Sequence, residues 1–256
     1  MSHGNGLNVG MWAAALPHLQ TRFRCFGIDL RGHGRSRPTR PDYGVARMLF
    51  AGDVVTAIDA IGEPVRFVGH SLGAAASVYA AIADSSPFVA LWLFEPVLIP
   101  VGYDTGGDGP SFLIAISRKR RMTFDSVDDA HRRFMSKPPY SGCDPVAVRG
   151  YVEVGTAVTD DGVRLTCRGE DEARVYESGE PIDFATLAVI DRPVVVASGA
   201  AADEANALPP KLAPVVAQAI PGARWEEYEG LSHFGPMEDP AAMARSITEH
   251  FTTIDP

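Results

Sequence analysis

The chain has 256 residues, of which 46% are hydrophobic and 21% are charged, and its formal net charge is −9. This length suits one large α/β domain, with or without an inserted subdomain. The negative charge argues against nucleic acid and anionic membrane surfaces as partners. No run approaches the ~18 apolar residues that a membrane helix needs, and the first residues do not resemble a signal peptide. We therefore expect a cytoplasmic globular protein that acts on a small molecule.

The cysteines give no sign of a metal centre or of an oxidising compartment. Cys25, Cys143 and Cys167 are odd in number, and their spacing matches neither a metal-ligand motif nor a disulfide framework. We expect neither a metal site nor structural disulfides.

Strand-like and helix-like runs alternate through most of the chain. This alternation predicts βαβ units and a mostly parallel central sheet flanked by helices. Several predicted strands are apolar almost throughout, as expected of strands buried on both faces. In chain order the expected elements are a helix at 11–19, a strand at 23–30, a helix at 49–61, a strand at 65–68, a helix at 74–83, strands at 89–94 and 193–197, a helix at 212–220, a strand at 224–228 and a helix at 241–251.

The alternation stops between about residues 100 and 190, where helical segments follow one another without convincing strands. We interpret residues 100–183 as a helical cap inserted into an α/β core made of residues 1–99 and 184–256. Aromatic side chains of the insertion could line an acyl pocket, although packing within the cap is the preferred interpretation. They are Tyr103, Phe112, Phe124, Phe134, Tyr140 and Tyr151.

The residues Gly69-His70-Ser71-Leu72-Gly73 join a predicted buried strand to an alanine-rich helix. A tight strand-to-helix turn forces its central residue into strained backbone angles, and only small residues two positions either side let the chain pass. The following helix brings its N-terminal dipole and the Leu72 N–H toward the same point. Ser71 is therefore predicted to be a nucleophile, whereas the neighbouring His70 is expected to point away.

A serine hydroxyl needs a general base, and His233 is the best candidate. It lies in a loop bracketed by glycines and a proline, directly after the last predicted strand. The base in turn needs an acid that orients it. Asp203, which follows the predicted strand 193–197, is the preferred acid, and Glu95, at the end of the predicted strand 89–94, is the alternative.

These motifs resemble those of the cap-bearing α/β-hydrolases, a family of esterases, lactonases, epoxide hydrolases and dehalogenases. The resemblance covers nearly the whole chain and includes His3-Gly4-Asn5-Gly6, the loop 29–38 and the histidine loop 232–240. It implies that the backbone N–H groups of Asn5 and Leu72 form an oxyanion hole. Both acid positions have precedent in this family.

A serine at position 71 indicates acyl transfer, because the related epoxide hydrolases and dehalogenases carry an aspartate there. The expected reaction is hydrolysis of a carboxylic ester, thioester or lactone through an acyl-serine, with no metal or organic cofactor. The same triad would also serve a hydrolase of carbon–carbon bonds or a cofactor-free perhydrolase of the haloperoxidase type. A non-catalytic binding protein of this fold is the non-enzyme alternative, and a homo-oligomer is left open.

The sequence departs from the family pattern at its beginning. Family members carry strands before the His-Gly loop, whereas only Met1 and Ser2 precede His3 here. Without the neighbouring strand, the strand that leads to Ser71 would leave backbone groups unpaired, at about 1–3 kcal/mol for each buried group. We expect the N-terminal strands to be missing because the true start codon lies upstream; an in-frame stop codon directly before Met1 would contradict this.

Overall fold

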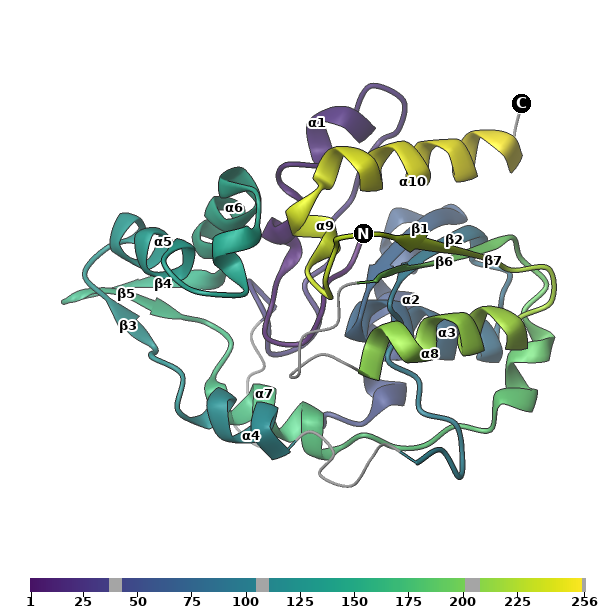
Figure 1. The fold of residues 1–256 in the computed structure, drawn as a ribbon, viewed down its shortest axis with the longest axis horizontal. Coiled ribbons are helices and arrows are strands. Elements are labelled where there is room, and N and C mark those ends of the chain that lie inside the picture. Colours follow the sequence, from purple (N-terminus) through teal and green to yellow (C-terminus); the bar gives the residue numbers. More distant parts are fainter. Residues whose placement is uncertain (37–42, 105–110, 201–207, 255–256) are drawn as a thin grey trace.

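The central layer of the structure, a computed structural model, is a four-stranded sheet (Figure 1). The structure describes residues 1–36, 43–104, 111–200 and 208–254. The strands lie in the order β1 (Val65–His70), β2 (Phe88–Phe94), β6 (Val194–Gly199) and β7 (Arg224–Tyr228), and every neighbouring pair is parallel. The prediction of a mostly parallel sheet flanked by helices is confirmed.

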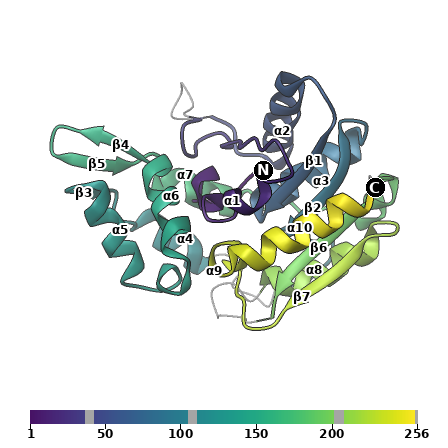
Figure 2. The same cartoon turned by 90° about the horizontal axis from the view of Figure 1, so that it is seen from above.

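Helices cover both faces of this sheet, which is why the central strands β2 and β6 are apolar on both sides (Figures 1 and 2). In β2, Leu91 and Leu93 belong to the core beneath the helices α2, α3 and α8, whereas Trp92 and Phe94 belong to the core beneath α10 and the N-terminal segment. The helices outside the insertion are η1 (Val9–Trp12), α1 (Leu16–Leu19), α2 (Arg47–Ile61), α3 (Leu72–Ala83), η3 (Phe184–Val189), α8 (Leu208–Ala219), α9 (Gly235–Glu238) and α10 (Pro240–Ile254).

The segment between β2 and η3 is mainly helical and lies at one end of the sheet (Figure 1). Its helices are α4 (Ser111–Arg118), α5 (Val127–Met135), η2 (Tyr140–Gly142), α6 (Pro145–Gly155) and α7 (Gly169–Glu177). It also contains an antiparallel sheet in the order β3 (Thr123–Phe124), β5 (Gly162–Leu165) and β4 (Thr156–Thr159).

The prediction that this insertion lacks strands is wrong. The turn at Asp160-Asp161 joins β4 to β5, and Gly162, the first residue of β5, has the positive φ of +131° that glycine tolerates. The sequence favours a helix over residues 144–158, whereas α6 ends at Gly155 and β4 begins at Thr156. Phe134, Tyr140 and Tyr151 pack against one another with ring centroids 4.9–5.4 Å apart, so these three aromatic residues serve the core of the insertion.

The prediction of a strand at 23–30 is also wrong, because the structure has no regular strand there. This segment is joined to Met1 by two hydrogen bonds, from the Met1 amino group to the Phe26 carbonyl and from the Ile28 N–H to the Met1 carbonyl. On its other side, the Ser2 N–H donates to the Val68 carbonyl of β1. A regular strand needs such bonds along its whole length. Beside them lies a groove of about 360 Å³ between this segment and β1.

The turn from β1 into α3 is strained and closely packed. Ser71 has φ +52° and ψ −111°, outside the regions that residues with a side chain normally adopt. A Cβ atom on Gly69 would lie 2.6 Å from the Ala74 Cα, and one on Gly73 would lie 2.8 Å from the His3 carbonyl oxygen. Both glycines are therefore required by space, because backbone atoms occupy the position of a side chain.

We predict that Gly69→Ala destabilises the protein by about 1–3 kcal/mol, because α3 must shift to accommodate the new methyl group. Gly52→Ala is the matched control: Gly52 is exposed in the middle of α2, and nothing lies within 4 Å of the position of its Cβ. The control should stabilise the protein by about 0.5–1 kcal/mol, because glycine is a poor helix former. Urea unfolding of both variants measures the difference; equal stabilities would contradict the prediction.

Candidate active site

Glu95 and His233 are brought together at the carboxyl ends of the parallel strands. Glu95 directly follows β2, is fully buried and has φ +46°. Its Oε1 accepts a hydrogen bond from the Gly199 N–H at the end of β6 (2.9 Å), and its Oε2 lies 2.5 Å from His233 Nδ1. The carboxylate is thus fixed by one strand and faces the imidazole with its second oxygen.

The contact with Glu95 assigns the tautomer of His233. An ionised carboxylate only accepts hydrogen bonds, so the proton lies on Nδ1 and Nε2 has a free lone pair. The loop that carries His233 is fixed by further bonds. Both the N–H and the hydroxyl of Ser232 donate to the carboxylate of Glu238, and His70 Nε2 lies 2.8 Å from the His233 carbonyl oxygen.

Ser71 begins the turn into α3 directly after His70. Its N–H donates to the carbonyl of Phe94, the residue before Glu95. This backbone hydrogen bond places Ser71 beside the start of the loop that carries the carboxylate. Within the described part of the chain, the Ser71 hydroxyl has no hydrogen bond to His233. Catalytic hydrogen bonds in apo structures often tighten only when substrate binds.

Several hydrogen bonds hold the loop around Asn5 in place. The Gly4 carbonyl accepts from the Leu7 N–H and from His3 Nδ1, and the Gly6 N–H donates to His33 Nε2. Across the described residues, the N–H of Asn5 finds no acceptor, and neither does the N–H of Leu72 at the start of α3. The Gly73 N–H donates to the His3 carbonyl, which ties this loop to the start of α3.

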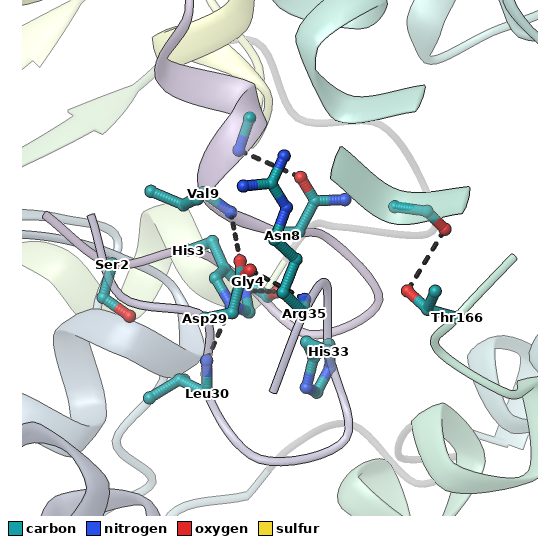
Figure 3. Close-up of polar contacts among 12 residues, drawn as sticks. Ser2, His3, Gly4, Asn8, Val9, Asp29, Leu30, His33, Arg35 and Thr166 are labelled. Atoms are coloured by element: carbon teal, nitrogen blue, oxygen red, sulfur yellow. Dashed lines mark hydrogen bonds and ion pairs between the residues drawn. The ribbon is translucent and has the colours of Figure 1, made fainter. Parts of the chain in front are cut away.

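Two buried histidines keep this loop in shape (Figure 3). The Leu30 N–H donates to His3 Nε2 (3.0 Å), so His3 is neutral although Asp29 lies 3.8 Å away. Burial, with a smaller effect from His33, lowers the pKa of His3 to about 3. Burial likewise lowers the pKa of His33. Asp29 instead accepts backbone bonds from Val9 and Arg35.

The structure places the predicted residues as follows. Ser71, Leu72, Glu95, His233 and Asn5 gather at the end of the sheet from which α3 begins, whereas Asp203 lies outside the described residues. The expectation that His70 points away from the site is wrong, because its ring centroid lies 4.7 Å from that of His233. The signal for this contact was its position next to Ser71.

The described residues contain no group of three or more His, Cys, Asp or Glu side chains that could hold a metal ion. None of the described helices combines the length and the apolar character needed to cross a membrane.

Comparisons with known proteins show which proteins this chain resembles. The chain is 40% identical over 79 residues to the pimeloyl-[acyl-carrier protein] methyl ester esterase of Methylococcus capsulatus, a match that covers 31% of this chain and 29% of that protein. It is 29% identical over 134 residues to protein phosphatase methylesterase 1 of Mus musculus, covering 50% of this chain and 33% of that protein. Each match thus spans about a third of the relative's length.

The crystal structure of E-2-(acetamidomethylene)succinate hydrolase superposes with a TM-score of 0.80 at 21% identity, covering 98% of this chain and 89% of that one. At this identity the likeness shows the fold alone. The sequence profile described as the alpha/beta hydrolase family matches residues 1–246. This match covers nearly the whole chain, and the chain therefore belongs to the alpha/beta hydrolase family.

Proposed function

We propose that this protein is a serine hydrolase that cleaves a carboxylic ester, thioester or lactone. The observation that carries the proposal is the buried contact between Glu95 and His233 beside the strained Ser71. A carboxylate that fixes an imidazole next to a serine is the arrangement of a Ser-His-acid triad. The methyl esterases among the relatives support an ester as the substrate.

In the proposed reaction, the Ser71 hydroxyl attacks the carbonyl carbon of the substrate while His233 Nε2 takes its proton. The carbonyl oxygen becomes an oxyanion, which accepts hydrogen bonds from the N–H groups of Asn5 and Leu72. His233 then gives the proton to the departing alcohol, thiol or lactone oxygen, leaving an acyl-Ser71 ester. A water molecule, deprotonated by His233, attacks this ester, and the acid is released as Ser71 regains its proton.

Three observations support Glu95 as the acid of the triad. Its Oε2 occupies the single hydrogen-bonding direction of His233 Nδ1, its Oε1 is fixed by the Gly199 N–H, and it is fully buried. A buried carboxylate with both oxygens engaged is held in one orientation, which is what an orienting residue requires. It also stabilises the imidazolium that forms when His233 takes the proton.

We predict that Ser71→Ala abolishes covalent labelling by a fluorophosphonate probe and lowers hydrolysis of p-nitrophenyl acetate by at least about 10³-fold, because the nucleophile is lost. Ser77→Ala is the matched control, since this serine lies on α3 with its hydroxyl bonded to the Ala74 carbonyl. The control should be labelled like the wild type. Labelling that persists in Ser71→Ala, or fails in a folded wild type, would refute the proposed function.

A second prediction assigns the acid. Glu95→Gln should lower kcat by about 10³-fold, because an amide cannot stabilise the imidazolium and stabilises the wrong tautomer. Asp203→Asn should change kcat by less than about threefold. The measurement is kcat for p-nitrophenyl acetate, with thermal unfolding to verify that both variants fold. A larger loss in Asp203→Asn than in Glu95→Gln would transfer the role to Asp203.

A further inference from the structure

His70 is buried between the two loops that carry the proposed catalytic groups. It is the last residue of β1, its side chain is 1% exposed, and its Nε2 lies 2.8 Å from the backbone carbonyl oxygen of His233. A carbonyl oxygen only accepts hydrogen bonds, so the proton of the neutral ring lies on Nε2. His70 therefore donates to the main chain of the residue whose side chain faces Glu95.

The other nitrogen of His70 has no partner. Nδ1 is buried and lacks a hydrogen bond to any described residue. Gly4 leaves the space for this edge of the ring, because a Cβ there would lie 2.8 Å from Nδ1. Burial, with a smaller effect from His233, lowers the pKa of His70 well below its ordinary value. The ring therefore stays neutral at neutral pH and keeps a single donor.

A buried polar atom without a partner costs about 1–3 kcal/mol, whereas an apolar ring of similar shape would leave no such atom. Packing alone therefore does not explain a histidine at this position. What the histidine provides and an apolar ring lacks is the hydrogen bond to the His233 carbonyl. Because His70 precedes Ser71 directly, this bond ties the main chain of the base to the strand end that carries the nucleophile.

We propose that His70 is a positioning residue. Its Nε2–H holds the His233 carbonyl, and Glu95 holds the His233 imidazole, so that the imidazole stays within reach of the Ser71 hydroxyl. This inference rests on the proposed function. Glu95 fixes the ring and the Ser232–Glu238 bonds fix the preceding residue, whereas the bond from His70 acts on the His233 main chain itself. Two bonds, one to the ring and one to the carbonyl, determine both the place and the direction of Nε2.

The test compares His70→Phe, which keeps the ring but removes the donor, with His70→Gln, whose amide nitrogen can reach the place of Nε2. With p-nitrophenyl acetate we expect His70→Phe to lower kcat by about 10–100-fold with KM changed less than about twofold, because small displacements of a catalytic group cost this much. His70→Gln should recover kcat to within about fivefold of the wild type. Titration with a fluorophosphonate gives the concentration of reactive sites, so that each kcat can be calculated per reactive site.

A spectroscopic measurement tests the same idea without turnover. The far-downfield proton signal of the bond between His233 Nδ1 and Glu95 should broaden or disappear in His70→Phe and persist in His70→Gln. His70→Met, which also lacks a donor, replaces His70→Phe if that variant does not fold.

The outcomes separate the two proposals. A wild-type kcat in the donor-free variant, or equal losses in the Phe and Gln variants, would overturn the role of His70. A folded wild type that neither hydrolyses the ester nor reacts with the fluorophosphonate would refute the proposed function instead. In that case the proton signal still tests whether His70 positions His233.

Discussion

The site depends on one buried carboxylate. Glu95 is fully buried, and removing a carboxylate from water is costly unless hydrogen bonds and a partner compensate for the lost hydration. Gly199 at the end of β6 supplies one bond, and the ring of His233 occupies the other oxygen. The parallel pairing of β2 with β6 brings the Gly199 N–H beside Glu95, so the sheet itself fixes the direction in which this carboxylate points. The position of His233 follows from that direction.

A second constraint is the supply of hydrogen bonds to the loop around Asn5. Buried backbone groups are almost always paired, and this loop uses His3 and His33 for that purpose. Each of these rings must be neutral to accept a backbone N–H, and burial keeps them so. Among the described residues, the N–H groups of Asn5 and Leu72 are exceptions to this pairing, because neither has an acceptor. Such exceptions suit groups that bind a charge formed during a reaction.

Sequence patterns predicted the parallel sheet, the turn at Ser71 and the gathering of Ser71 with His233, because each depends on local signals: apolar runs, spaced glycines and loop residues. They favoured Asp203 as the acid and kept Glu95 as the alternative, since both follow strands that end at the same edge. That choice depends on distances across the sheet, and Glu95 is the one that the described residues place beside His233. The strand at 23–30 was overpredicted because an apolar run carries no information about whether a neighbouring strand is present.

The contact of His70 with His233 was missed for a similar reason, since it joins residues 163 positions apart. The short strands β3, β4 and β5 were missed because runs of two to four residues give too little periodicity to distinguish a strand from the end of a helix. The residues Asp160-Asp161-Gly162, at the turn of the hairpin β4–β5, were the local signal for it.

Hydrogen bonds connect the insertion to the loop around Asn5, whose N–H is proposed to bind the oxyanion. Arg120 lies 2.8 Å from Glu172, and both side chains are largely buried. Arg120 Nη1 and the Tyr151 hydroxyl both approach the Gly6 carbonyl, and the Asn5 side chain donates to the Glu172 carbonyl. A buried ion pair adds little stability, because its attraction is largely offset by the lost hydration. It does fix geometry, so a displacement of the insertion would move the Gly6 carbonyl, which lies in the same loop as the Asn5 N–H. These contacts therefore link the position of the insertion to the loop that carries the Asn5 N–H.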